Sequence, residues 1–270
     1  MGLPGVPGLE SMRRFFIDPQ LLTEEQIRLP EEILRHLRVL RLQPGMEIEL
    51  LDGAGLSCSC ELLELDRRRG LARVKKRHRV SENTLPLTLL QGLPKGDKFD
   101  LVLQKGTELG ISRFVPTLCE RCQPSGRPRL PRWQRIIREA ARQSGRMLLP
   151  ELAEPLPLGD ALNRCRSELR LVPWEQDTTP LQAVLPSTAP RDAAILIGPE
   201  GGLSAAEVEM AQQQGFIPVS LGSRILRTET AGFAVAGILQ YLYGDLGTNR
   251  ERSTGDSDSS LNRPRKGRGL

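Results

Sequence analysis

The chain has 270 residues, of which 39% are hydrophobic and 26% are charged, and its net charge is +5. This composition suits one large or two modest folded domains, and no apolar run is long enough to span a bilayer as a helix. The five cysteines lack the regular spacing of a secreted disulfide framework. The N-terminus also lacks the charged start and apolar core of a secretory signal, so we expect a cytoplasmic protein with no membrane partner.

The positive charge is unevenly distributed. The segment 248–270 carries six Lys/Arg against three Asp/Glu, which accounts for +3 of the total. Residues 67–79 hold eight Lys/Arg and no acid, and residues 113–146 hold nine arginines. A solvated surface is the ordinary explanation for a single basic stretch, but two such stretches in one chain favour RNA as a partner.

Residues 12–80 have the pattern of a small β-domain. We expect a helix from residue 30 to about 40, with Pro30 at its start and acids in its first turn. Short strands with glycine turns between them are typical of a small barrel. The expected strands are 13–17, 46–51, 56–65 and 71–80.

Residues 86–246 alternate strands with helices, which predicts a parallel sheet covered on both faces. The expected strands are 87–90, 112–118, 169–173, 193–197 and 216–221. The expected helices are 95–109, 131–146, 158–166, 204–214 and 230–243. Residues 81–86 have the composition of a linker, and the Ser/Gly/Asp/Arg-rich tail 247–270 is expected to be disordered.

Two glycine-bearing loops follow consecutive strands of this α/β pattern. Strand 193–197 leads into Gly198-Pro199-Glu200-Gly201-Gly202, and strand 216–221 leads into the segment LGSRILRTETA. Strand ends of this kind form ligand crevices, and glycine lets the backbone approach a ligand closely. The first loop precedes a capping box, Ser204 to Glu207, whose helix N-terminus suits an anion. A plain strand-to-helix connection and a structural loop are the alternatives.

These segments also resemble a known family. LIGPEGGLSxxE followed by LGxRILRTETA is similar to the signature of the ribosomal RNA small subunit methyltransferase E family of knotted (SPOUT-class) enzymes, and the likeness extends to residues 36–41, 105–110 and 139–146. The resemblance implies a PUA-like RNA-binding β-barrel at 12–80 and a SPOUT α/β domain with a C-terminal trefoil knot at 86–246. It further implies a homodimer that uses S-adenosyl-L-methionine to methylate the N3 atom of a uridine in 16S ribosomal RNA.

The resemblance implies roles for particular residues. Arg227 would stabilise negative charge on the uracil and Glu229 would accept the proton or hold Arg227, although a helix-start acid is the alternative for Glu229. The implied cofactor-binding residues are Val172, Pro173, Glu175, Gly198, Pro199, Glu200, Gly201, Leu221, Gly222, Ile225 and Leu226. The candidate RNA-binding residues are Arg14, Arg38, Arg41, Gln143 and Arg146. A solvated helix end is the alternative for Gln143 and Arg146.

Other interpretations remain open at this stage. Cys119 and Cys122 have metal-like spacing, but no second pair lies at a zinc-binding distance in sequence, so we expect no metal site. The chain could act as a knotted methyltransferase on another RNA or position, although the LRTETA segment argues against this. It could also be a non-catalytic RNA-binding ribosome-assembly factor. The expected partner is small-subunit ribosomal RNA, free or within the ribosomal particle.

Overall fold

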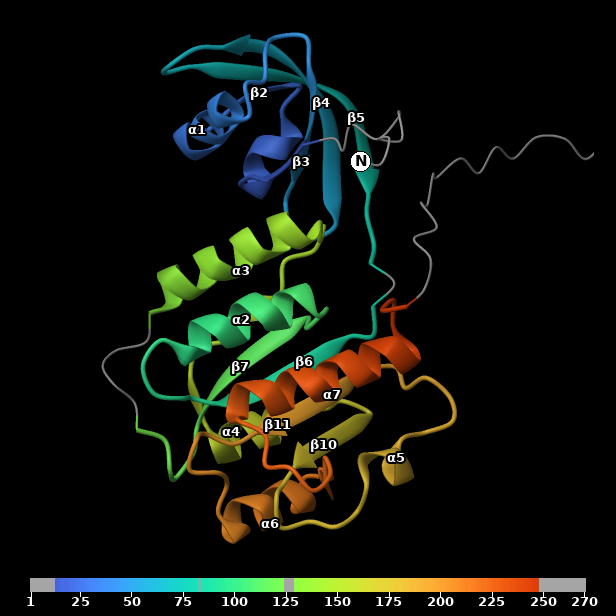
Figure 1. The fold of residues 1–270 in the computed structure, drawn as a ribbon. Helices are drawn as coiled ribbons and strands as arrows, with labels where there is room; N and C mark the ends of the chain where they lie inside the picture. The colour runs from blue at the N-terminus through green and yellow to red at the C-terminus, as the bar shows by residue number, and fades with distance from the viewer. Residues whose placement is uncertain (1–12, 83, 124–128, 248–270) are drawn as a thin grey trace, which may run out of the picture.

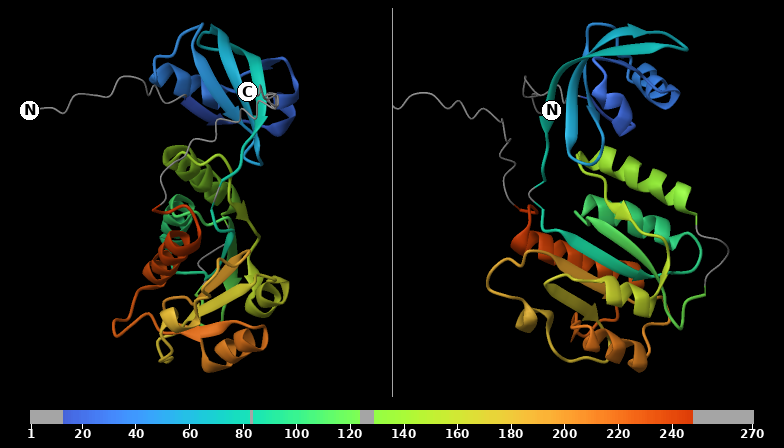
Figure 2. Two further views of the ribbon diagram at one scale, coloured as in Figure 1. Left: turned by 90° about the vertical axis from the view of Figure 1, so that its right-hand side faces the viewer. Right: turned by 180° about the vertical axis from the view of Figure 1, so that it is seen from behind.

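The computed structural model describes residues 13–82, 84–123 and 129–247, which form two sheets with separate hydrophobic cores (Figures 1 and 2). The mixed α/β architecture predicted from the sequence is confirmed. The predicted disordered tail lies outside the described residues, apart from Gly247. Among the described residues, no helix combines the length and the apolar character needed to cross a membrane.

The N-terminal sheet has five strands in the order β1-β3-β4-β5-β2. Neighbouring strands are antiparallel except β1 and β3, which are parallel, with Phe16 opposite Leu51. Alternate residues of β4 point inward, so Cys58, Cys60 and Leu62 are buried beneath the helix α1. The elements are β1 (Arg13–Phe16), the 3-10 helix η1 (Pro19–Thr23), β2 (Gln26–Arg28), α1 (Glu31–Val39), β3 (Glu47–Leu51), β4 (Leu56–Leu65) and β5 (Gly70–Arg79).

The C-terminal sheet is parallel throughout, with the order β12-β10-β11-β6-β7-β8 and with β9 paired to β7. Because the strands are parallel, the carboxyl ends of β12, β10, β11 and β6 lie at one edge of the sheet. The strands are β6 (Leu87–Gly92), β7 (Arg113–Leu118), β8 (Glu151–Leu152), β9 (Leu156–Pro157), β10 (Leu169–Pro173), β11 (Ala193–Ile197) and β12 (Ile217–Val219).

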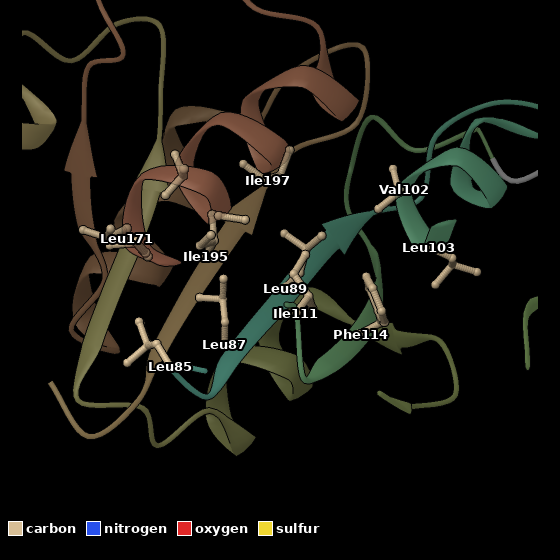
Figure 3. Packing of buried hydrophobic residues seen from close by; sticks show 14 of the residues in the cluster. Leu85, Leu87, Leu89, Val102, Leu103, Ile111, Phe114, Leu171, Ile195 and Ile197 are labelled. Carbon is tan, nitrogen blue, oxygen red and sulfur yellow. The ribbon is translucent and has the colours of Figure 1, made fainter. Parts of the chain in front are cut away.

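Helices cover both faces of the parallel sheet (Figure 2). One face packs against α2, α3 and α7 through a core that includes Phe99, Trp133 and Val235, and the other packs against α4 and α6. Figure 3 shows Leu89 and Ile195 of adjacent strands contributing to the first core. The helices are α2 (Lys98–Glu108), α3 (Leu130–Ser144), α4 (Leu158–Arg164), α5 (Leu181–Val184), α6 (Ala205–Gln213) and α7 (Thr228–Tyr243).

The two sheets are joined by a small shared core and a buried ion pair. Phe16 and Leu51 of the first sheet pack with Ala141 of α3. Glu82, in the predicted linker, pairs with Arg146 at 2.9 Å and accepts hydrogen bonds from two backbone N–H groups that follow α3. Glu82 therefore holds the segment 81–86 against the end of α3. The domain bounds 12–80 and 86–246 stay a prediction.

Candidate active site

Three loops far apart in sequence meet at the carboxyl edge of the parallel sheet. β10 lies between β11 and β12, with Leu171 opposite Ile195 on one side and Ile217 on the other. The loop after β10 approaches the loop after β11, because a Cβ added to Gly202 would lie 3.1 Å from Glu175 Oε1. The structure thus brings together the segments that contain all eleven predicted cofactor-binding residues.

The turn after β11 is built from close backbone contacts. The N–H of Gly202, at φ +72°, donates to the carbonyl oxygen of Pro199 at 2.9 Å. Gly92 at the end of β6 packs against this turn so closely that an added Cβ would lie 2.7 Å from Pro199 N. The predicted capping box follows, with Ser204 and Glu207 at the start of α6. These contacts fix the position of the turn relative to β6 and α6.

Glu200 anchors the same turn from its other side. Its carboxylate accepts from Lys98 Nζ at 2.8 Å and from the backbone N–H of Lys95 at 3.1 Å. Partial burial opposes the charge, but the Lys98 ammonium and these N–H groups hold the pKa of Glu200 below its usual value. The side chain of Glu200 therefore binds the 198–202 turn to the segment before α2. Because this side chain is already engaged, we expect a ligand to contact the backbone of the turn.

The loop after β12 leaves apolar and cationic groups exposed. Gly222 adopts φ +101°, and a Cβ added there would meet no atom of the described residues within 4 Å. The side chain of Ile225 is 87% exposed. Arg227 is also exposed and begins α7 as its N-cap residue. The loop consequently presents backbone and one large apolar side chain that a bound ligand could cover.

A buried polar network connects the two loops. The hydroxyl of Thr228 donates to the carbonyl oxygen of Gly198. Gln91 Nε2 donates to Thr228 Oγ1 at 2.9 Å and to the carbonyl oxygen of Gly92 at 3.1 Å. Gln91 is 1% exposed at the end of β6, so its amide ties the start of α7 to the turn after β11. Neither Gln91 nor Thr228 was predicted as a site residue. For Gln91, the signal in the sequence was a polar residue near the end of an otherwise apolar strand.

Among the described residues, three polar atoms at this edge are buried without a hydrogen-bond partner. They are Gln91 Oε1 at the end of β6, Glu229 Oε2 in the first turn of α7, and Trp174 Nε1 directly after β10. Unsatisfied buried polar atoms are rare in folded proteins, and a catalytic role is one of the explanations for them. Among the described residues Glu229 Oε2 has no partner in Arg227, and the role of Glu229, as proton acceptor or as the residue that holds Arg227, stays a prediction.

The candidate RNA-binding residues fall into two groups. Arg38, Arg41 and Gln143 are exposed. Arg146 is only 9% exposed and donates to the carbonyl oxygens of Thr107 and Ile111 as well as pairing with Glu82. Arg14 pairs with Glu49 at 2.7 Å and contacts the end of α3. Arg14 and Arg146 therefore connect parts of the fold, and their roles in RNA binding stay predictions.

The α3 helix borders two hollows. One lies between α1 and α3 and is lined by His36, Arg135 and Arg138, among others. The other, of about 660 Å³, is lined in part by Arg135, Gln104 and Gln143. In the part of the chain that the structure describes, neither Arg135 nor Arg138 pairs with a carboxylate. The basic stretch 113–146 thus includes cations that are free to meet an anionic partner.

Comparisons with known proteins agree with this architecture. Residues 81–240 match a family model described as an RNA methyltransferase domain, and residues 29–75 match an RNA methyltransferase PUA domain. The Synechocystis sp. ribosomal RNA small subunit methyltransferase E is 38% identical, with 81% of this chain and 74% of the relative covered. The Bacillus subtilis enzyme of the same name is 30% identical, with 85% and 96% covered.

Solved structures show the same fold. A ribosomal RNA small subunit methyltransferase E from Neisseria gonorrhoeae, bound to S-adenosyl methionine, superposes with a TM-score of 0.79 at 36% identity, covering 87% of this chain and 99% of that one. A methyltransferase from Legionella pneumophila in complex with the same cofactor has a TM-score of 0.76 at 30% identity, covering 87% and 99%. The chain belongs to the ribosomal RNA small subunit methyltransferase E family of RNA methyltransferases.

Proposed function

We propose that this protein transfers the methyl group of S-adenosyl-L-methionine to the N3 atom of a uridine in small-subunit ribosomal RNA. The observation that carries the proposal is the convergence of the loops after β10, β11 and β12 at one edge of the sheet. Membership of the family supports it, as do two solved relatives that hold the cofactor.

The residues at this edge fit such a cofactor. The backbones of Leu221, Gly222 and Leu226 would contact the adenine and methionine parts, and the 198–202 turn would contribute further backbone groups. Val172 is fully buried in the core beneath α6, so it would contribute its backbone only. Trp174 Nε1 is a buried donor with no hydrogen-bond partner among the described residues. When bound, the cofactor supplies a methyl group already activated on its sulfonium.

The chain's own contribution to the reaction is alignment and control of charge. The neutral N3 atom of uridine carries a weakly acidic proton and no available lone pair, so the proton must leave. Arg227, exposed at the start of α7, would stabilise the negative charge that develops on a uracil oxygen. Glu229, two residues later, has a buried carboxylate oxygen without a partner and would accept the proton.

RNA would lie along α3 and the N-terminal sheet. Arg135 and Arg138 face the hollow between α1 and α3, and Arg38 and Arg41 are exposed at the end of α1. Phosphate contacts release counterions, so each lost contact should lower the slope of log affinity against log salt by roughly one. Substitution of Arg138 by Ala should therefore weaken binding to small-subunit RNA and reduce this slope.

A homodimer and a trefoil knot belong to the same proposal. α7 exposes Ile238, Tyr241 and Leu242, an apolar surface of the kind that a second subunit would cover. Light scattering of the purified chain tests the dimer, because a monomeric mass would refute it. For the knot, the support is the contact of Thr228 with Gly198, which places the segment 221–228 against the turn after β11.

The test combines cofactor binding with methyl transfer. The purified chain should bind S-adenosyl-L-methionine in calorimetry and should methylate small-subunit rRNA, with the product mapped by mass spectrometry to N3 of a uridine. Arg227→Ala should abolish transfer while cofactor binding remains, whereas Arg164→Ala, an exposed arginine on α4, should leave transfer unchanged. Absence of cofactor binding would favour an assembly factor, and methylation of another RNA or position would refute the assigned specificity.

A further inference from the structure

Two cysteines form a close pair at the end of β7. Cys119 and Cys122 lie at the first and fourth positions of a turn in which the N–H of Cys122 donates to the carbonyl oxygen of Cys119 at 3.0 Å. In a β-turn these two Cα atoms are within about 7 Å of each other. A disulfide requires a Cα separation of about 4.4–6.8 Å. The turn therefore places the two thiols within bonding range without a large backbone movement.

The two thiols differ in access and in acidity. Cys122 is partly exposed, and its sulfur accepts a hydrogen bond from the backbone N–H of Cys119 at 3.3 Å. The thiol of Cys119 also hydrogen-bonds to this sulfur, and together these contacts lower the pKa of Cys122 to about 7. Cys119 is 8% exposed, and its bond to Cys122 and its burial raise its pKa. One cysteine is thus reachable and nucleophilic, and the other is its buried neighbour.

The remaining cysteines are all buried. Cys58 and Cys60 are fully buried on β4, and burial raises the pKa of each thiol. Cys165 is buried at the end of α4 in the core beneath α6. All five cysteines are reduced in the structure, so these three provide an internal comparison for the reactivity of Cys122.

The turn 119–122 also contacts the 198–202 turn and the start of α6. Between the two cysteines, the N–H of Glu120 donates to Glu207 Oε1 at 2.8 Å, and Glu207 is the N3 residue of the capping box of α6. Arg121 Nη1 donates to the carbonyl oxygen of Gly201 at 2.8 Å. The packing is close, because a Cβ added to Gly201 would lie 3.1 Å from Arg121 Cβ. A change in the backbone at 119–122 is therefore transmitted to the 198–202 turn.

We propose that Cys119 and Cys122 are a redox-active thiol pair that forms a disulfide by exchange with a small-molecule disulfide, and that this disulfide weakens cofactor binding. The thiolate of Cys122 attacks one sulfur of the oxidant, whose S–S bond breaks and releases one thiolate. Cys119 then loses its proton to that thiolate and attacks the sulfur of Cys122, and the second small thiolate leaves and takes up a proton. Two protein thiols are oxidised and one disulfide is reduced to two thiols.

The effect on the cofactor follows from the contacts that the new bond disturbs. Formation of the disulfide turns the Cys122 side chain away from the N–H of Cys119 and moves the intervening residues, which hold Gly201 and Glu207. This second part of the proposal rests on the proposed function. Loss of one ordinary hydrogen bond to the turn should weaken binding of S-adenosyl-L-methionine by about fivefold.

The experiment exposes the folded, full-length protein to oxidised glutathione at a pH above the pKa of Cys122. Mass spectrometry after denaturation and alkylation should show loss of two hydrogens and a peptide pair linking 119 to 122. Cys119→Ser should stop at the mixed disulfide on Cys122, and Cys122→Ser should leave Cys119 unmodified. Cys165→Ala, a change at a buried cysteine outside the pair, should react as the parent does. Calorimetry with the cofactor then compares reduced and oxidised protein.

The outcomes separate the two proposals. A disulfide between 119 and 122 that forms before any other modification, and is reversed by a thiol reductant, supports the inference. First modification at another cysteine, or no reaction while the protein is folded, overturns it. Equal cofactor affinity in the reduced and oxidised forms overturns the coupling alone. If the reduced protein does not bind the cofactor at all, the proposed function fails while the disulfide result still stands.

Discussion

The close approach of β6 to the turn after β11 gives a sharp test of the candidate site. In Gly92→Ala, the added Cβ would lie 2.7 Å from Pro199 N and 2.9 Å from Gly198 C. Ordinary Cβ contacts begin near 3.4 Å, so the turn must move by about 0.7 Å. Both neighbours are backbone atoms, which cannot rotate away as a flexible side chain would. Overpacking of this kind costs about 1–3 kcal/mol of stability.

The displaced turn should bind S-adenosyl-L-methionine at least about tenfold more weakly, because its backbone groups no longer align with the ligand. Calorimetry gives the affinity and urea unfolding gives the stability. The matched control is Gly159→Ala in α4, where the nearest atom to an added Cβ is Met210 Sδ at 3.7 Å. Normal cofactor affinity in a folded Gly92→Ala protein would show that the turn does not form the cofactor site.

Three further predictions concern buried or paired polar groups. Gln240→Leu should lower the free energy of unfolding by roughly 2–4 kcal/mol in urea titrations, because its amide satisfies three backbone groups beside β6 and α2. Arg146→Met should cost about 3 kcal/mol by leaving Glu82 buried and unpaired, whereas an unchanged melting temperature would contradict this role. The folded-state pKa of Glu200 is lowered, so its stabilising effect is present above the unfolded pKa and is lost as the pH falls through the folded pKa. Glu200→Gln should therefore be less stable than the parent at neutral pH, and the difference should disappear in acid.

Elements with strong local signals were predicted well. β10 and β11 have the bounds expected from their apolar runs, and Ser204 forms the capping box at the start of α6. β2, β8 and β9 were not predicted, because segments of two or three residues carry no measurable period. Their pairing is determined by neighbouring strands in the sheet. Local sequence therefore specified the long elements, and tertiary contacts specified the short ones.

The site was predicted as a set of segments and not as a network of contacts. The glycine loops after β11 and β12 meet as expected, because parallel strands place their carboxyl ends at one edge. Gln91 contacts Thr228, 137 positions away, and no spacing in the sequence indicates this pair. The direction of the Glu200 side chain, toward Lys98, likewise depends on how the segment before α2 passes the turn. Such contacts require the assembled fold.

Burial separates arginines that the sequence cannot distinguish. Arg146 and Arg138 lie in the same basic stretch, yet Arg146 has its guanidinium inside the protein with a carboxylate and two carbonyl oxygens, whereas Arg138 is exposed and has no carboxylate partner among the described residues. An internally satisfied guanidinium gains little from a phosphate, because it would have to leave Glu82 unpaired. A surface guanidinium such as that of Arg138 leaves no buried carboxylate unpaired when it binds a phosphate, and this binding releases counterions from the RNA. The salt dependence of RNA binding should therefore respond to Arg138 and not to Arg146, and the melting temperature should respond in the opposite way.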